Sequence, residues 1–290
     1  MKTQEGLRAL FDPKGVIVAG ASTHPGKFGF VSLHNLLAAG YRGDVFATNR
    51  EGAEVLGVRS VASVDDLPDG KADLAELPDG TYDLIFVCTP ASVNPDLLRA
   101  AAAKGIRAAF VTSAGYGEAG EAGIAAQAEL VALCDELGIL LAGPNGQGVV
   151  STPAELCAQI VAPYPPAGAI GVASQSGNFV SSFLNYAVQT GVGISRAVSA
   201  GNAVAVTVPD YLDFYADDPE TKVGLAYVEG VPDGRTFLDR MSSVASEPVW
   251  LAAARWPPEV APPLTRTRGL RRATDDMRSR NARPSGTPST

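Results

Sequence analysis

The sequence predicts an α/β protein with two domains in series, and three features point to this class. Short apolar segments alternate with amphipathic helical segments along most of the 290-residue chain. The proline-rich stretch IVAPYPPAG at 160–168 interrupts the alternation near the middle and indicates a domain boundary. The alternation then resumes, which is typical of a second α/β unit. Strands that alternate with helices imply parallel sheets covered by helices on both faces.

The first half contains five strand-like segments joined by helices. The expected strands are GVIVAG (15–20), DVFATN (44–49), DLIFVCTP (83–90), RAAFVTS (107–113) and ILLAGPNG (139–146). The expected helices are 29–40, 94–105 and 121–138. Residues 1–150 are therefore assigned to the first domain.

The second half repeats the pattern. Its expected strands are 169–177, 194–202, 222–230 and 248–254, and its expected helices are 178–191, 208–219 and 234–246. Residues 151–255 are assigned to the second domain. Residues 256–290 are rich in Arg, Pro, Ser and Thr and are expected to form a disordered tail.

Composition excludes several classes of function. The net charge of -8 argues against general nucleic-acid binding, which needs a basic surface. No apolar run reaches the roughly 18 residues of a membrane span. The first residues lack the apolar core of a signal peptide, so a cytoplasmic protein is expected. Cys88, Cys134 and Cys157 form no CxxC pair; they are expected to be buried free thiols, and no metal site is predicted.

The turn VIVAGASTHPGKFG, residues 16–29, is the first candidate site. Gly20 and Gly26 would let the backbone approach a ligand, Ser22 and Thr23 offer hydroxyl groups, and Lys27 adds a positive charge. Phosphate groups bind at such strand-to-helix turns because the first amides of the helix are free. The segment lacks a GxGxxG pattern, and it also fits a plain glycine-rich turn.

Three further strand ends are candidates. Ser174, Gln175, Ser176 and Gly177 run directly into a helix, so their backbone amides fit an anion site, although Ser176 also fits a simple helix cap. Glu229 follows a strand as either a catalytic carboxylate or a solvated turn residue. The segment AGPNGQG at 142–148, which includes Asn145, fits either a cleft wall or a tight turn.

The sequence contains two histidines, His24 in the glycine-rich turn and His34 in the first long helix. A single histidine on a helix is more often packed or capping than catalytic. No Ser/His/Asp arrangement and no metal-ligand spacing is found.

Six segments in this order resemble the ADP-forming acyl-CoA (acetate–CoA) synthetases, and more distantly the α subunit of succinyl-CoA synthetase. They are VAGASTHPGKFGF, VTSAGYGEAGEAG, GILLAGPNGQGVV, AIGVASQSGNFVSS, SAGN and YADDPETKVGLAYVEGVPDGRTFL. The resemblance spans roughly 8–250, and the run DDPETK, EG and DGR is its most specific part.

The resemblance implies a Rossmann-like CoA-binding domain followed by a flavodoxin-like ligase domain. In that family, acyl-CoA, ADP and phosphate are interconverted with acid, CoA and ATP through a phosphohistidine. ATP, ADP and Mg²⁺ would be bound by a separate ATP-grasp (β-type) domain or subunit. The implied CoA contacts are Gly20, Ser22, Thr23, Lys27, Asn49, Thr112, Ser113 and Asn145. Residues 174–177 would hold phosphate, and Glu229 would orient the phosphorylated histidine.

The chain departs from the family pattern at three places. Gly146 stands where relatives often carry cysteine, and Ala205 where they tend to carry aspartate. The third departure is the phosphorylated histidine, because no histidine follows His34. Relatives present it in a segment like GGRAAA followed by SHTGS.

A reading-frame shift would account for the missing histidine. In the shifted frame, each codon consists of the last base of one codon and the first two bases of the next. The degenerate codons from Pro258 can then spell Gly-Gly-Arg-Ala-Ala, and those from Thr265 can spell Ser-His-Thr-Gly-Ser. We therefore hypothesise a frameshift between Pro248 and Pro258, which would truncate the second domain. A natural disordered tail is the alternative.

The sequence is compatible with three functions. The first is the α-type portion of an acyl-CoA synthetase that binds CoA but lacks its histidine. The second is a non-catalytic CoA-binding or regulatory protein. The third is an NAD-dependent oxidoreductase, which rests on the first turn alone.

Overall fold

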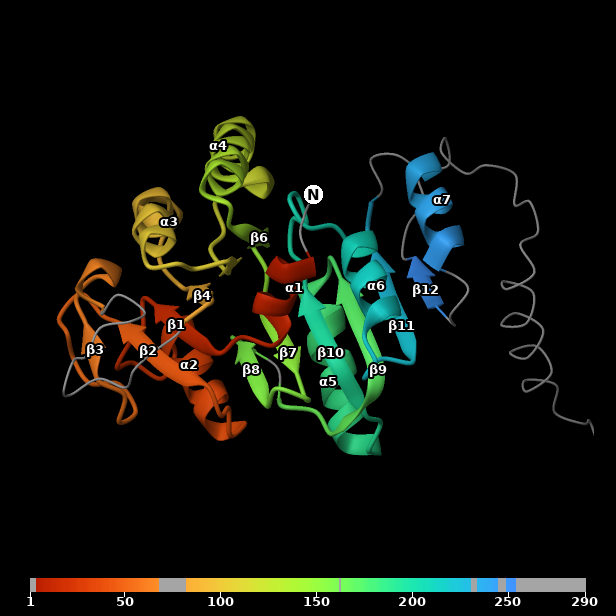
Figure 1. Ribbon diagram of the computed structural model, residues 1–290, viewed down its shortest axis with the longest axis horizontal. Helices are drawn as coiled ribbons and strands as arrows, with labels where there is room; N and C mark the ends of the chain where they lie inside the picture. The colour runs from red at the N-terminus through yellow and green to blue at the C-terminus, as the bar shows by residue number, and fades with distance from the viewer. Residues whose placement is uncertain (1–3, 68–81, 162, 231–233, 245–248, 254–290) are drawn as a thin grey trace, which may run out of the picture.

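The computed structural model describes residues 4–67, 82–161, 163–230, 234–244 and 249–253. Within these residues the chain forms two sheets of six strands each, one in each half of the molecule (Figure 1). Helices lie against both sheets, so the predicted pair of α/β units is confirmed. The predicted tail, residues 256–290, lies outside the described residues.

The first sheet has the strand order β3-β2-β1-β4-β5-β6, and all of its paired strands are parallel. The strands are β1 Gly15–Ala19, β2 Asp44–Thr48, β3 Ser60–Val61, β4 Leu84–Val87, β5 Ala108–Val111 and β6 Leu140–Ala142. This is the Rossmann-like order that the resemblance implies. The order reverses between β1 and β4, and ligands bind beyond the carboxyl ends of the strands at such a point.

The second sheet has the order β12-β11-β9-β10-β7-β8. Its strands are β7 Gly148–Ser151, β8 Leu156–Gln159, β9 Ala167–Ser174, β10 Ile194–Ser199, β11 Val223–Val228 and β12 Val249–Ala253. The four strands β9 to β12 are parallel and match the expected segments. The antiparallel hairpin β7–β8 was not expected. The predicted boundary between residues 150 and 151 falls within β7 and stays a prediction.

Helices cover both faces of each sheet. They are α1 Gln4–Phe11, α2 Phe28–Ala38, α3 Asn94–Ala103, α4 Glu121–Leu137, α5 Gly177–Thr190, α6 Val208–Asp217 and α7 Gly234–Val244. Side chains alternate across a strand, so Val16 and Val18 of β1 face the core with α1 and α2, whereas Ile17 and Ala19 face the core with α3 and α4. The fully buried strands account for their continuous apolar sequence.

One apolar cluster continues from the first sheet into the second, and α1 lies at the junction (Figure 1). The ring of Phe11, at the end of α1, stacks on Phe214 of α6 at 5.1 Å between ring centres. Tyr211 of α6 meets the same ring edge-on at 6.1 Å. The two domains therefore share a hydrophobic core instead of meeting only at their surfaces.

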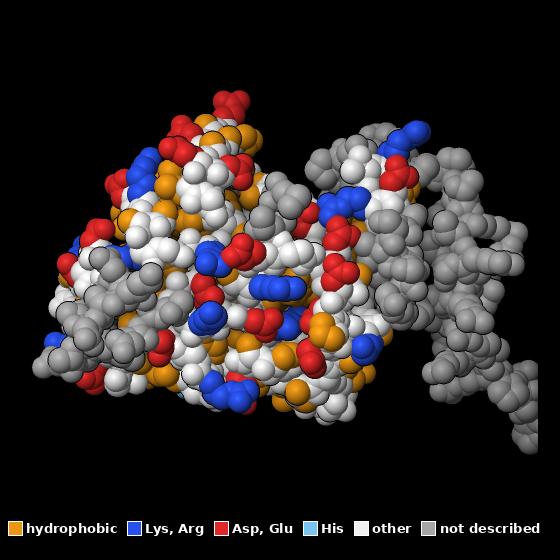
Figure 2. All heavy atoms as spheres, in the orientation of Figure 1, with side chains coloured by type: hydrophobic (Ala, Val, Ile, Leu, Met, Phe, Trp, Pro, Cys, Tyr) orange, Lys and Arg blue, Asp and Glu red, His pale blue; other side chains and the backbone are white. Residues whose placement is uncertain are grey.

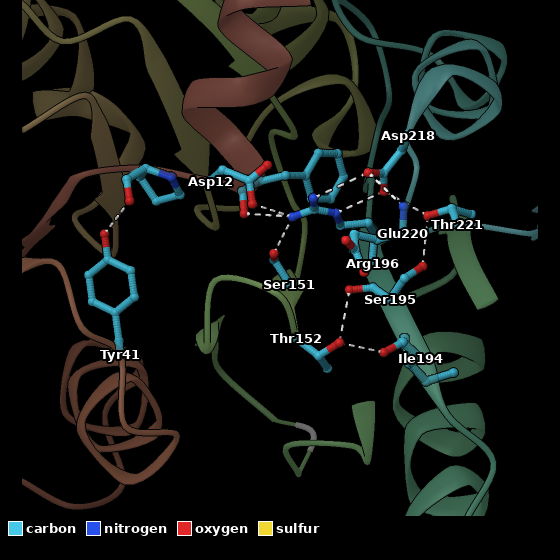
Figure 3. A network of polar contacts seen from close by, with 12 residues as sticks. Asp12, Tyr41, Ser151, Thr152, Ile194, Ser195, Arg196, Asp218, Glu220 and Thr221 are labelled. Carbon is cyan, nitrogen blue, oxygen red and sulfur yellow. Dashed lines mark hydrogen bonds and ion pairs between the residues drawn. The ribbon is translucent and has the colours of Figure 1, made fainter. Parts of the chain in front are cut away.

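A buried arginine joins the same elements through polar contacts (Figure 3). The side chain of Arg196, on β10, is only 4% exposed. Its Nε donates to Asp218 Oδ2 at 3.1 Å, and its Nη1 donates to the carbonyl oxygen of Phe11 at 3.2 Å. The same guanidinium also bonds to Asp12 and to Ser151 of β7. It therefore connects α1, the β7–β8 hairpin, β10 and the turn after α6.

The turn after α6 carries the DDPETK segment, the most specific part of the family resemblance. Asp218 accepts a hydrogen bond from Thr221 Oγ1 at 2.8 Å, and the Thr221 hydroxyl lies 2.7 Å from that of Ser195. Burial alone would raise the pKa of Asp218, but hydrogen bonds from Arg196 and Thr221 lower it below its usual value. These two residues of the motif hold the turn after α6 to β10 of the second domain.

The three cysteines are free thiols; Cys134 and Cys157 are buried and Cys88 is half-buried. Burial raises the pKa of all three, to about 11 for Cys88 and about 12 for the other two.

No helix of the described residues is long and apolar enough to cross a lipid bilayer. On the face drawn in Figure 2, acidic and basic side chains are interspersed over both domains.

Removing Arg196 should destabilise the protein strongly, because two carboxylates would lose their counter-charge and one of them is buried. We expect Arg196→Met to lower the free energy of unfolding by about 3 to 5 kcal/mol in urea titrations. Arg42→Met is the matched control, because Arg42 pairs with Glu155 at the surface with 75% of its side chain exposed. An exposed pair contributes at most about 1 kcal/mol. Equal losses in the two variants would contradict this account.

The destabilisation of Arg196→Met should also depend on pH. In the native protein the lowered pKa of Asp218 contributes stability above the unfolded pKa of about 3.9, and this contribution is lost as the pH falls through the folded pKa. In the variant, burial without the guanidinium would raise that pKa, so protonation relieves the penalty. The difference in unfolding free energy between the two proteins should therefore shrink between pH 7 and pH 4. A constant difference would mean that Asp218 does not carry it.

Candidate functional site

The loop between β1 and α2 is shaped by two glycines. Gly20 has a φ of +80°, which side-chain-bearing residues rarely adopt. Gly29 lies in the first turn of α2, where an added Cβ would overlap the carbonyl oxygen of Gly20. By contrast, a Cβ at the predicted residue Gly26 would meet nothing within 4 Å. Gly29 therefore permits the close approach of α2 to the end of β1, whereas the expected approach of a ligand to the backbone at Gly26 stays a prediction.

The amino end of α2 is open. Its N-cap residue, Lys27, makes no side-chain capping bond. The first-turn amides of a helix have no acceptor within the helix, so they are available to an anion. Thr23 and Lys27 are exposed around this end, and Ser22 is half-buried, with its Oγ accepting from the amide of His24 at 3.1 Å.

Asn49 holds the loop from the next strand. Its Nδ2 donates to the carbonyl oxygen of Ala21 at 2.8 Å, and its Oδ1 accepts from the amide of Glu51 at 2.9 Å. The side chain of Asn49, expected to contact the cofactor, is thus used in bracing the loop backbone. The amide of Gly20 donates to Thr48 Oγ1 at 3.3 Å.

Thr112 and Ser113 lie at the carboxyl end of β5, as predicted, but both hydroxyl groups point into the protein. Thr112 Oγ1 donates to the carbonyl oxygen of Val87 at 2.8 Å, and Ser113 Oγ to that of Thr89 at 2.5 Å. The fully buried Asn94 donates to Ser113 Oγ at 3.1 Å and to the Tyr116 hydroxyl at 2.8 Å. These bonds tie the ends of β4 and β5 together, and sequence reasoning gave no signal for Asn94.

In the second domain, β9 ends in the predicted turn 174–177 and α5 begins at Gly177. Ser176 caps α5 by accepting from the amide of Phe179 at 3.4 Å, and Ser174 Oγ accepts from the amide of Ser176 at 3.0 Å. The expected capping of α5 by Ser176 is therefore confirmed, and the anion site at the same turn stays a prediction. The amides of Gly177 and Asn178 belong to the first turn of α5, where amides have no acceptor within the helix and can bind an anion.

Gln175 connects the turn to Glu229. Its Oε1 accepts from the backbone amides of Glu229 at 2.7 Å and Gly230 at 3.2 Å. The Gln175 side chain is therefore directed at the backbone of the other strand end, while its predicted role toward phosphate stays untested. The structure brings Glu229 beside the turn, and its side chain is exposed.

The two domains meet where the segment 143–146 contacts the loop after β10. Asn145 has a φ of +60° and follows the cis Gly143–Pro144 bond. Its amide donates to the carbonyl oxygen of Ser113 at 3.0 Å. A Cβ at Gly146 would lie 2.5 Å from the carbonyl oxygen of Ser199, so this residue needs to be glycine here. Ala205 is 5% exposed and packs in the core of the first domain.

Both histidines lie far along the chain from Glu229. His24 is exposed in the β1–α2 loop, and His34 is exposed on α2 with its ring 6.5 Å from that of Phe30. The ring contact with Phe30 is a packing contact of the kind expected for a helix histidine, although the residue as a whole is exposed. Among the described residues of the second domain, from β7 onward, there is no histidine.

Two family models match the chain and cover both domains. Residues 14–152 match a CoA-binding domain, and residues 167–260 match a succinyl-CoA ligase-like flavodoxin domain. Two curated ADP-forming acetate–CoA ligases match 83% and 82% of the chain at 34% and 36% identity, so the chain belongs to the ADP-forming acyl-CoA synthetase family. The resemblance inferred from the six sequence segments is thereby confirmed.

Several curated relatives of this chain are acetate–CoA ligases. It is 34% identical over 242 residues to the α subunit of acetate–CoA ligase [ADP-forming] I of Pyrococcus furiosus, covering 83% of this chain and 51% of the relative. It is 36% identical to acetate–CoA ligase [ADP-forming] I of Archaeoglobus fulgidus, covering 82% of this chain and 33% of the relative. The chain thus spans about half or less of the length of these relatives.

A solved structure shares both the fold and the family. The acetyl-coenzyme A synthetase 1 of Ca. Korarchaeum cryptofilum, in complex with phosphate and ADP, superposes with a TM-score of 0.78 at 30% sequence identity. The match covers 88% of this chain and 52% of that one.

The glycine contacts of the β1–α2 loop give a stability test. Gly29→Ala would force α2 away from β1, and we expect a loss of about 1 to 3 kcal/mol in the free energy of unfolding. Gly26→Ala is the control in the same loop and should change this free energy by no more than about 0.5 kcal/mol. The comparison is made by urea titration followed by circular dichroism. A larger loss for Gly26→Ala than for Gly29→Ala would contradict the close packing of α2 on the β1 loop.

Proposed function

We propose that this chain is the CoA-binding and phosphate-binding α-type portion of an ADP-forming acyl-CoA synthetase. The reaction of the whole enzyme would interconvert acyl-CoA, ADP and phosphate with acid, CoA and ATP. ATP, ADP and Mg²⁺ would bind on a separate ATP-grasp (β-type) domain or subunit. As written, the chain lacks the histidine that carries the phosphoryl group, so it would bind CoA without completing the transfer.

The open amino end of α2 is the observation that carries the proposal. The amides of Phe28 and Gly29 follow directly on the loop of Ser22, Thr23 and Lys27, next to the point where the strand order reverses, and Lys27 makes no side-chain capping bond. A phosphate group of CoA would be bound there by backbone amides and the Lys27 ammonium group. Because Asn49, Thr112 and Ser113 are bonded to the backbone, we assign them to holding the walls of this site.

The turn 174–177 and Glu229 would form the phosphoryl site. Phosphoryl transfer depends mainly on positioning and charge stabilisation, and helix amides can supply both. Glu229 would stand beside the imidazole and fix its tautomer. The bonds from the Glu229 and Gly230 amides to Gln175 support this arrangement, since they hold the two strand ends together.

The frameshift hypothesis supplies the missing part of this site. The flavodoxin-like match ends at residue 260, close to the codons that can spell the histidine segment in another frame. Sequencing the gene across codons 248–258 tests it directly. A gene sequence without a frameshift between these codons would contradict the hypothesis. Formation of an acid-labile phosphoprotein by this chain, with ATP and an ATP-grasp partner, would contradict the proposed loss of transfer.

Two other functions make different predictions. A non-catalytic CoA-binding protein would bind CoA equally well but gain no turnover when the histidine segment is restored. An NAD-dependent oxidoreductase is compatible with the strand order of the first sheet. It would bind NADH more tightly than CoA, which a parallel calorimetric titration of the two ligands decides.

Lys27 provides the test of the CoA site. A hydrogen bond to a charged group contributes about 1.5 kcal/mol or more, so Lys27→Ala should weaken CoA binding by about 10-fold in isothermal titration calorimetry. Lys222→Ala is the control, since Lys222 is exposed on the second domain. Equal CoA affinity in the two variants would remove Lys27 from the site.

A further inference from the structure

The loop Ser199–Ala203 is bonded to both domains through its backbone. The amide of Ala200 donates to the carbonyl oxygen of Ser174 at 2.7 Å, where the proposed phosphate turn begins. Asn202 donates from its amide to the carbonyl oxygen of Pro144 at 2.9 Å, in the segment that joins the domains. Gly201 fits beside the same carbonyl only because it lacks a Cβ. This loop, which we call the linking loop, therefore contacts the phosphate turn on one side.

On its other side the linking loop is held by the side chain of Asn202. Its Nδ2 donates to Glu118 Oε2 at 2.6 Å and to Gln127 Oε1 at 2.8 Å. Its Oδ1 accepts from Asn145 Nδ2 at 3.2 Å. Both amide hydrogens are thus used. The half-buried side chain of Asn202 thus has three side-chain partners, whereas a surface asparagine can bond to water instead. All three partners, Glu118, Gln127 and Asn145, come from the first half of the chain.

Glu118 and Gln127 extend these bonds to the segment that follows Thr112 and Ser113, which we assigned to the walls of the proposed CoA site. Glu118 Oε1 accepts from the amides of Gly115 at 2.5 Å and Tyr116 at 3.1 Å, and Gln127 Oε1 accepts from the amide of Gly117 at 3.2 Å. Burial by itself would raise the pKa of Glu118, but hydrogen bonds from Asn202 and these amides lower it. The ionised carboxylate therefore fixes the segment that follows β5.

We propose that Asn202 is a positioning residue that couples the binding of CoA to the binding of phosphate. This inference rests on the proposed function of the two sites. Hydrogen bonds connect the phosphate turn, the linking loop and the segment that follows β5. A ligand that orders the turn or that segment reduces the conformational freedom of the linking loop, so that binding the second ligand costs less conformational entropy. The coupling is reciprocal, since each ligand must raise the affinity for the other by the same factor.

The experiment is calorimetric titration of the full chain with CoA, in the absence and presence of saturating inorganic phosphate. We expect phosphate to tighten CoA binding by about 5-fold in the native protein, at the lower end of usual coupling. Asn202→Ala should reduce this factor below about 2-fold while the protein stays folded by circular dichroism. A purely structural role would lower the melting temperature without changing the factor.

Asn185→Ala is the matched control, because Asn185 is exposed on α5 and its side-chain amide donates to the carbonyl oxygen of Ser181 in its own helix. It should keep the full coupling. Gln127→Ala is a second variant that leaves the linking loop unchanged and removes one partner of Asn202. It should give a partial loss, and it keeps the test available if Asn202→Ala does not fold.

The outcomes separate the two proposals. If the native chain binds no CoA, the proposed function fails and this inference fails with it. If CoA and phosphate both bind but independently, only the inference is overturned. Full coupling retained in Asn202→Ala, or in Gln127→Ala where that variant replaces it, would likewise overturn the role of Asn202 alone.

Discussion

The guanidinium group of Arg196 lies almost out of contact with water, and its N–H groups need acceptors there because an unpaired buried charge is costly. The acceptors come from parts of the chain that are far apart in sequence: the end of α1, the strand β7 and the turn after α6. All of these acceptors must be in place for the N–H groups of the Arg196 guanidinium to be hydrogen-bonded. The relative position of the two sheets follows from this constraint together with the shared apolar core around Phe11.

The proposed ligand sites use a different physical principle. Both are strand-to-helix turns in which a glycine permits a close approach, and free helix amides supply the attraction for an anion. At the first turn the close approach is made at Gly29, and at the second a Cβ on Gly177 would lie 2.5 Å from the side chain of Gln147. The polar side chains near these turns are largely occupied in bracing the backbone. Binding would then depend on how well the loops are held.

Much of the fold could be predicted because periodic patterns report local structure. Buried parallel strands are continuous apolar runs, and α2 to α7 are amphipathic, so their ranges were close to those observed. The hairpin β7–β8 was missed because its strands have four residues each and follow the turn-like GPNGQG without a helix between them. α1 was missed because it has only eight residues and precedes the first strand, outside the alternation of strands and helices that located the others.

The sequence predicted where the residues of the candidate site lie, but not which partners their side chains contact. The strand ends at Ser113, Asn145 and Ser174 are where the pattern places them, but the direction of each side chain depends on partners from other elements. Gln175 reaches residues 54 and 55 positions away, and no local pattern encodes such a bond. Asn202 was noted only as part of SAGN, since its partners lie up to 84 positions earlier.

The place of α1 has a consequence for how the protein is made. Phe11 leaves the ribosome early, but the carbonyl oxygen of Phe11 is bonded to Arg196, 185 positions later. At synthesis rates of roughly 5–20 residues per second, about 10 to 40 seconds pass before that partner exists. During this interval the apolar face of α1 that later packs on α6 has no cover from the second domain. A first domain expressed by itself would keep that surface exposed permanently, so its solubility would depend on a polar substitution at Phe11, because α1 also covers the core of the first sheet and has to stay in place.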